Sequence, residues 1–94
     1  MADFDFIRAG QRVINVAQTA LDNLLPHIDA RFQNACNILL ACKGRAVVSG
    51  MGKSGHIGNK IAATLASTGT PAFFVHPGEA SHGDLGMITP QDVV

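Results

Sequence analysis

The stretch VVSGMGKSGHIG, from Val47 to Gly58, joins a short β-branched run to a run of residues with helical spacing. Three of its glycines, Gly50, Gly52 and Gly55, have the spacing G-x-G-x-x-G. Glycine lets the backbone approach a ligand closely, and the N-terminus of a following helix favours anionic groups. The stretch therefore predicts a strand, then a loop that binds an anionic ligand, then a helix.

Three classes of ligand fit a glycine loop of this kind: a mononucleotide, a dinucleotide and a sugar phosphate. A mononucleotide P-loop needs a glycine five residues before the glycine of Gly-Lys-Ser, but Val47 occupies that position. A dinucleotide site needs an acidic residue at the end of the next strand, and the first acid there, Glu79, comes late. Backbone amides, the Lys53 ammonium and the Ser54 hydroxyl suit a small polyol phosphate. The sugar-phosphate interpretation is favoured, and the dinucleotide interpretation stays open.

Before this stretch, the apolar spacing predicts two helices. The first is long and amphipathic, from residue 4 to residue 25, and Pro26 ends it. Its apolar residues recur every seven positions, at Ile7, Ile14 and Leu21. The second helix is expected from 29 to 42, with Asp29 as its N-cap and Gly44 as the residue that stops it.

After the first strand, at 45–49, the pattern predicts a strand–helix–strand unit. The helix is expected at 56–69 with Gly69 as its C-terminal cap, and the second strand at 72–75. A long loop or short helix, a turn and a third strand that begins at Val93 complete the pattern. Two parallel strands joined by a helix imply an α/β fold, whose ligands bind at the carboxyl ends of the strands.

The composition excludes several classes of protein and partner. The 94 residues suffice for one small domain, and 47% hydrophobic against 15% charged residues predict a packed core. Seven basic residues balance seven acidic ones, so binding to nucleic acid or to an anionic membrane is not expected. No apolar run approaches the roughly 20 residues of a membrane span, and the N-terminus does not resemble a secretory signal. Cys36 and Cys42 are predicted to be buried, reduced thiols, as in a cytoplasmic protein.

Three blocks together resemble the first half of a sugar isomerase (SIS) domain: GKSGHIG (52–58), STGTP (67–71) and HPGEASHGDLGM (76–87). They are similar to the D-arabinose 5-phosphate isomerases, which start bacterial 3-deoxy-D-manno-octulosonate (lipopolysaccharide precursor) synthesis. The resemblance implies interconversion of D-arabinose 5-phosphate and D-ribulose 5-phosphate through an enediol.

The resemblance also implies an organisation of the chain. We expect an N-terminal helical region at 1–41 and the first part of a SIS domain at 42–94. The fold would be a parallel-sheet SIS-type α/β sandwich in truncated form: two helices, a βαβ unit and the start of a third strand. Family members continue through a serine-rich phosphate loop and further active-site acids, so we expect these 94 residues alone to be a poor or inactive isomerase.

Four residues are candidates for the site, and the resemblance gives Lys53 and His82 their roles. Lys53 matches a catalytically relevant lysine, and an ammonium there would stabilise the charge of an enediolate. His82 matches a histidine that contacts the substrate, and Gly52 belongs to the same substrate-binding set. Ser54 is expected to bind the substrate or to cap the helix.

Two further substrate contacts implied by the resemblance, Gly69 and Thr70, fall at the opposite edge of the expected sheet. In that position they could serve only the site of a neighbouring subunit. His76 matches a position linked to a divalent metal, for which zinc with Glu79, His82 or another chain is the hypothesis. No cofactor is otherwise required.

The expected partners are a small sugar phosphate and further copies of the chain, because Ile7, Ile14 and Leu21 form a narrow apolar seam. His27 and His56 are predicted to be structural or solvent-exposed. The alternatives to an isomerase are a non-catalytic SIS module that senses sugar phosphates and a dinucleotide-binding half-domain.

Overall fold

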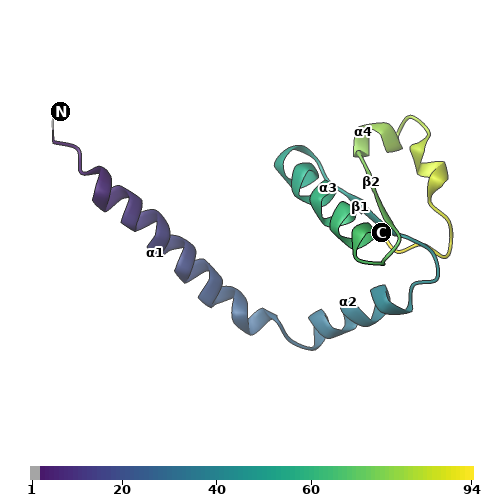
Figure 1. Cartoon of the computed structure of the whole chain (residues 1–94), viewed down its shortest axis with the longest axis horizontal. Coiled ribbons are helices and arrows are strands. Elements are labelled where there is room, and N and C mark those ends of the chain that lie inside the picture. The colour runs from purple at the N-terminus through teal and green to yellow at the C-terminus, as the bar shows by residue number, and fades with distance from the viewer. Residues whose placement is uncertain (1–2) are drawn as a thin grey trace. The chain divides into compact units, whose positions relative to one another are not determined.

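The computed structural model describes residues 3–94. The chain divides into two compact units, Met1–Ala35 and Cys36–Val94. In chain order the elements are α1 (Phe6–Leu24), the 3₁₀ turn η1 (Leu25–His27), α2 (Ala30–Ala41), β1 (Ala46–Ser49), α3 (Gly52–Ser67), β2 (Ala72–Val75), α4 (Pro77–Ala80) and the 3₁₀ turn η2 (Asp84–Met87) (Figure 1). The helices and parallel strands confirm the predicted α/β class.

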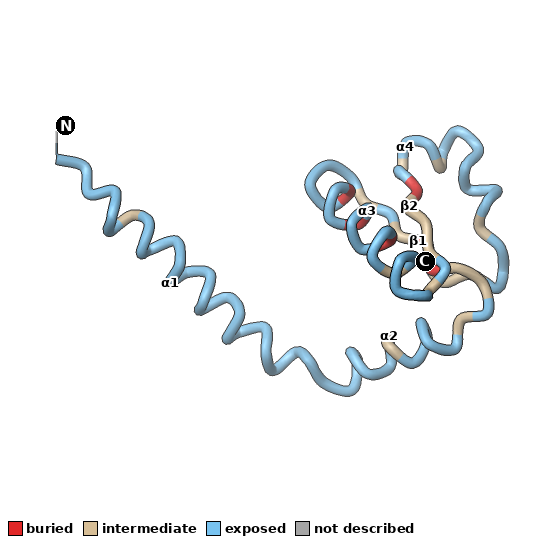
Figure 2. Tube along the Cα trace, viewed as in Figure 1, coloured by how far each residue is buried: buried red, intermediate tan, exposed pale blue. Residues whose placement is uncertain are grey.

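The first helix, α1, is amphipathic, and a side chain holds its start. Asp5 accepts a hydrogen bond from the amide of Arg8 at 2.9 Å, as an N-cap does. None of the 19 residues of α1 is buried, and Figure 2 draws the helix almost entirely in the colour of exposed residues. The expected seam is 77%, 59% and 67% exposed at Ile7, Ile14 and Leu21. Within residues 3–94, no helix combines the length and the apolar character needed to cross a bilayer.

The second helix, α2, begins as predicted, but its end has a different cause. Asp29 accepts a hydrogen bond from the amide of Arg31 at 3.0 Å, and the Arg31 guanidinium beside it lowers the pKa of the Asp29 carboxyl. The helix ends at Ala41, and Gly44 does not adopt the left-handed conformation of a helix-stopping glycine, so that prediction is wrong. A Cβ at Gly44 would lie 2.7 Å from the carbonyl group of Gln91, so this glycine permits a close approach of the C-terminal turn.

The strands β1 and β2 form a parallel sheet, and α3 connects them. The register pairs Ala46 with Ala72 and Ser49 with Val75, so both strands end at one edge of the sheet. The observed strands agree with the predicted ones to within one residue. The core lies between this sheet and α3, and its buried apolar residues are Ala46, Val47, Ala62 and Val75.

Val93 lies where the sequence predicted the start of a third strand. It forms a parallel bridge with Ala46, in which the amide of Val47 donates to the carbonyl of Val93 at 2.7 Å. The amide of Val93 donates in turn to the carbonyl of Arg45 at 3.0 Å. Because β2 occupies the other side of β1, the chain returns across β1 after forming β2. The carboxyl end of β1 is therefore a topological switch point, where open parallel sheets bind ligands.

The crossover helix α3 begins four residues earlier than the predicted start at residue 56. Its N-cap is Met51, and no side chain caps the helix, so the capping alternative for Ser54 is wrong. Gly52 is the first helical residue and has a φ of 57°, a conformation that glycine adopts without strain. Gly52, Lys53 and Ser54 therefore form the first turn of a helix rather than a loop before it.

The other end of α3 agrees with the prediction. Gly69 follows the helix with a φ of 104°, in the left-handed region. The amide of Thr70 donates to the carbonyl of Leu65 at 2.9 Å, which is the bond that closes a helix ending in glycine. Gly69 is thus confirmed as the residue that stops α3.

Two glycines allow α3 to lie directly on the strands. A Cβ at Gly55 would lie 2.6 Å from the carbonyl oxygen of Gly50. A Cβ at Gly58 would lie 3.1 Å from a methyl carbon of Val48 and 3.2 Å from the ring of Phe74. Both glycines are buried, so each serves the packing of the helix against the sheet.

We expect Gly55→Ala to destabilise the Cys36–Val94 unit by about 1–3 kcal/mol, because the new methyl group would overlap a backbone oxygen. Gly58→Ala should cost less, because its neighbours are side chains that can shift. Gly10→Ala is the control, since nothing lies within 4 Å of a Cβ there. Unfolding in urea compares the variants. Equal midpoints for Gly55→Ala and Gly10→Ala would contradict the packing argument.

Candidate functional site

A pocket of about 270 Å³ lies at the edge where β1 and β2 end. Four of its lining residues come from the first turns of α3, and two come from the end of β2: Gly52, Gly55, His56, Asn59, Phe74 and His76. Two imidazoles and one carboxamide therefore share a pocket with an aromatic wall. No lysine or arginine is among the lining side chains of the described residues. This combination suits a small ligand with several hydrogen-bonding groups.

Two hydrogen bonds fix the β2 side of this pocket. The Ser49 hydroxyl donates to the carbonyl of Val75 at 2.6 Å and ties the ends of the two strands together. Nδ1 of His76 accepts from the amide of Gly78 at 3.0 Å, so His76 is the N-cap of the short helix α4. As an acceptor, Nδ1 carries no proton, and the other ring nitrogen, Nε2, remains for a ligand.

The structure brings together only some of the residues expected at the site. Gly52 and His76 line the pocket. Lys53 and Ser54 follow Gly52 in the first turn of α3, and both are exposed, but their side chains do not line the pocket. His82 lies after α4, where its amide donates to the carbonyl of Glu79 at 3.0 Å, and it does not line the pocket either.

Sequence reasoning missed two residues of the pocket. His56 was predicted to be structural or solvent-exposed, and Asn59 was given no role, yet both line the pocket. The signal for them is their spacing, because positions 52, 55, 56 and 59 lie on one face of a helix. That signal became usable only once the helix was known to begin at Gly52.

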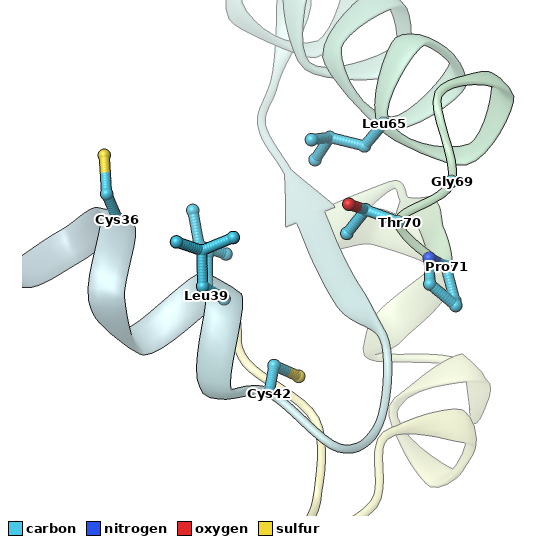
Figure 3. A pocket seen from close by; sticks show the side chains of 8 residues that line it. Cys36, Leu39, Cys42, Leu65, Gly69, Thr70 and Pro71 are labelled. Carbon is cyan, nitrogen blue, oxygen red and sulfur yellow. The ribbon is translucent and has the colours of Figure 1, made fainter.

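Gly69 and Thr70 lie elsewhere in the unit. They precede β2, whereas the first pocket lies where β1 and β2 end, so they lie at the opposite edge of the sheet, as expected. They border a second, larger pocket of about 450 Å³, shown in Figure 3. Its lining is Cys36, Leu39, Leu40, Cys42, Leu65, Gly69, Thr70 and Pro71. The substrate role of the two residues stays a prediction.

The SIS domain model matches residues 39–94, more than half of the chain. This chain belongs to the SIS domain family. The match begins at residue 39, and the compact units meet between Ala35 and Cys36. The predicted domain boundary, between residues 41 and 42, coincides with neither of these positions and stays a prediction.

Relatives of this SIS chain share most of its residues. Arabinose 5-phosphate isomerase KdsD of Pseudomonas aeruginosa is 65% identical over 92 residues, which are 98% of this chain and 28% of the relative. The KdsD of Escherichia coli K12 is 62% identical over 91 residues, 97% of this chain and 28% of the relative. The chain therefore spans less than a third of the length of these curated relatives.

Solved structures give the same fold. The structure of E. coli CFT073 c3406 in complex with arabinose 5-phosphate matches 97% of this SIS chain and 50% of its own, with a TM-score of 0.77 and 42% identity. A crystal structure from Listeria monocytogenes matches 96% of this chain and 49% of its own, with a TM-score of 0.77 and 24% identity. The predicted SIS-type fold is therefore confirmed for the part of the domain that this chain spans.

The metal hypothesis for His76 does not receive a complete ligand set. Within residues 3–94, no three His, Cys, Asp or Glu side chains gather as a metal site would require. Nδ1 of His76 accepts from the Gly78 amide, so the ring proton lies on Nε2, which then has no lone pair for a metal. Zinc takes three or four protein ligands, and the described residues do not fit it by themselves.

The two cysteines of the SIS chain are free thiols, as predicted, but they are half-buried rather than fully buried. The Cys42 thiol donates to the carbonyl of Gln91 at 3.4 Å. This contact joins the residue after α2 to the C-terminal turn, so the structure gives Cys42 a packing role.

His76→Ala is expected to loosen the turn at α4 by about 1 kcal/mol, because it removes the side-chain acceptor for the Gly78 amide. His76→Asn retains an acceptor and should lose less. Exchange of the Gly78 amide hydrogen measures the difference in both variants. If the Gly78 amide exchanges as fast in the wild type as in His76→Ala, the cap contributes nothing to the turn.

Proposed function

We propose that this SIS chain is part of an arabinose 5-phosphate isomerase that interconverts D-arabinose 5-phosphate and D-ribulose 5-phosphate through an enediol. The observation that carries the proposal is the 65% identity, over 98% of the chain, to a relative of that name. The pocket at the switch point also suits the polyol part of a sugar phosphate, because its side chains both donate and accept hydrogen bonds. The reaction would start bacterial 3-deoxy-D-manno-octulosonate synthesis.

During the reaction a proton moves between two adjacent carbons, and negative charge develops on the oxygens of the enediolate. We assign the stabilisation of this charge to the ammonium of Lys53, which follows the pocket residue Gly52. The free amides at the N-terminus of α3 add positive potential at the same place. Ser54 would donate its hydroxyl to the substrate, and His82 would add a hydrogen bond from the turn after α4.

Two further assignments belong to this proposal. Gly69 and Thr70 would contact the substrate of a neighbouring subunit, because they precede β2 while the pocket follows it. His76 would bind a divalent metal such as zinc through Nε2 after Nδ1 releases the Gly78 amide and takes the ring proton, with the other ligands supplied by another chain. Elemental analysis of the purified protein before and after chelation tests the metal directly.

Lys53→Ala is expected to lower kcat for D-arabinose 5-phosphate by about 100-fold, because it removes one stabilising donor from the transition state. Its melting temperature should not change, since Lys53 is exposed. Lys60→Ala, an exposed lysine on the same helix away from the pocket, is the control and should keep full activity. The measurement is steady-state kinetics on the whole protein that carries this sequence.

Undiminished turnover in Lys53→Ala would remove Lys53 from the catalytic role. Binding of D-arabinose 5-phosphate by the wild-type protein without any turnover would instead favour the non-catalytic sensing module. The two results are distinct, because the first concerns one variant and the second concerns the wild type.

We further propose that the protein is a cytoplasmic homo-oligomer. The free thiols favour a reducing compartment. The seam of α1 exposes apolar side chains at Ile7, Ile14 and Leu21, and exposed stripes of this kind usually pack against another surface.

Replacing Ile14 and Leu21 by Gln should shift the assembly toward smaller species, because it removes apolar surface from the middle of the seam. Arg12→Gln on the same helix is the control, since it leaves the seam intact. Sedimentation velocity across a concentration series measures the shift. A wild-type protein that sediments as a monomer at every concentration would refute the assembly proposal.

A further inference from the structure

We propose, on the basis of the proposed isomerase function, that His56 and Asn59 determine substrate specificity by binding the hydroxyl groups of the sugar rather than its phosphate. Both side chains line the pocket at the ends of β1 and β2. Neither residue has a role in the catalytic assignment above.

The packing of α3 fixes the direction of these two side chains. Gly55 faces the carbonyl oxygen of Gly50 so closely that no side chain fits between them. The helix therefore cannot rotate about its axis without moving a larger residue into this contact. His56 and Asn59 lie beside Gly55 on the same face of the helix, so they are held at the pocket.

The chemistry of the lining favours hydroxyl groups over a phosphate. A phosphate dianion is bound best by arginine or lysine side chains, and neither is among the lining side chains of the described residues. A carboxamide and a neutral imidazole each offer both a donor and an acceptor, as a sugar hydroxyl does. His76 contributes a donor through Nε2, because its Nδ1 accepts from the Gly78 amide.

The pocket is large enough for the sugar part of the ligand. Its volume of about 270 Å³ lies just below the roughly 300–1,000 Å³ of pockets that hold drug-sized ligands, and a pentose phosphate is smaller than those. The choice between the two ends of the ligand therefore rests on the chemistry of the lining. We assign the polyhydroxyl end to it, with the phosphate outside.

The test uses the whole protein that carries this sequence, with D-arabinose 5-phosphate as substrate and inorganic phosphate as competitive inhibitor. His56→Ala and Asn59→Ala should each raise KM for the sugar phosphate about 3- to 10-fold, since each loses a hydrogen bond to a neutral group. The inhibition constant of inorganic phosphate should change less than twofold. Lys60→Ala is the control on the same helix and should change neither constant.

Two conservative variants separate binding from a structural role. His56→Asn retains a polar group near the position of Nδ1, and His56→Gln retains one near Nε2. One of them should recover most of the lost affinity, whereas neither would rescue a role that needs only the bulk of the ring. Because His56 is exposed, the melting temperatures should stay equal.

Three outcomes would overturn the inference: an unchanged KM in both alanine variants, an equal loss of phosphate inhibition, or no recovery by either conservative variant. Failure of the proposed function looks different, since the wild type would then show no turnover. In that case calorimetric binding of D-arabinose 5-phosphate replaces kinetics, and the inference still requires weaker binding in His56→Ala and Asn59→Ala. If the wild type does not bind the sugar phosphate at all, the inference fails as well.

Discussion

The contact between α3 and the strand end at Gly50 is the constraint on which the site depends. Gly55 and Gly58 bring the helix so close to the sheet that a Cβ at either position would meet another atom within 2.6–3.2 Å. The same approach directs the first turns of α3 at the edge where β1 and β2 end. The Ser49 hydroxyl closes this edge by its hydrogen bond to Val75, at 2.6 Å. The pocket is therefore a consequence of helix packing. Gly55 and Gly58 are needed for that packing whether or not a ligand binds.

A second constraint acts at the opposite end of β1. The Asp92 side chain is 1% exposed and accepts from the amides of Thr89 and Arg45, each at 2.7 Å. These hydrogen bonds, with Thr89 the larger cause, lower the pKa of Asp92 below its ordinary value. A lowered pKa means that the contribution to stability is present above pH of about 4 and is lost as the pH falls through the folded value. Acid therefore weakens the turn that brings Val93 beside β1. The switch point depends on this turn, because it requires Val93 and β2 to pair with opposite sides of β1.

Much of this fold was predictable from the sequence. Ala72–Val75 was predicted to the residue, because Pro71 and His76-Pro77 bound a short apolar run on both sides. The start of α3 was not predictable, because it has no side-chain cap and depends on a left-handed φ at Gly52. His56 was missed for the same reason, since its face of the helix is defined only after the helix start is known. Which glycines pack against the sheet depends on the tertiary approach, which one sequence does not contain.

The earlier helix start also changes the electrostatics of the proposed site. Lys53 and the unpaired amides of the first turn place positive charge and positive potential together at one end of α3. One turn further, His56 and Asn59 add side chains that form hydrogen bonds. The proposed enediolate has the same polarity along its length, with negative charge on the oxygens of its reacting carbons and hydroxyl groups on the carbons that follow. Because a helix rises about 1.5 Å per residue, these two parts of α3 are separated by a few ångströms, the scale of a pentose carbon chain. A single helix held on the sheet by glycine can thus stabilise the reacting carbons by charge and hold the neighbouring hydroxyl groups by hydrogen bonding.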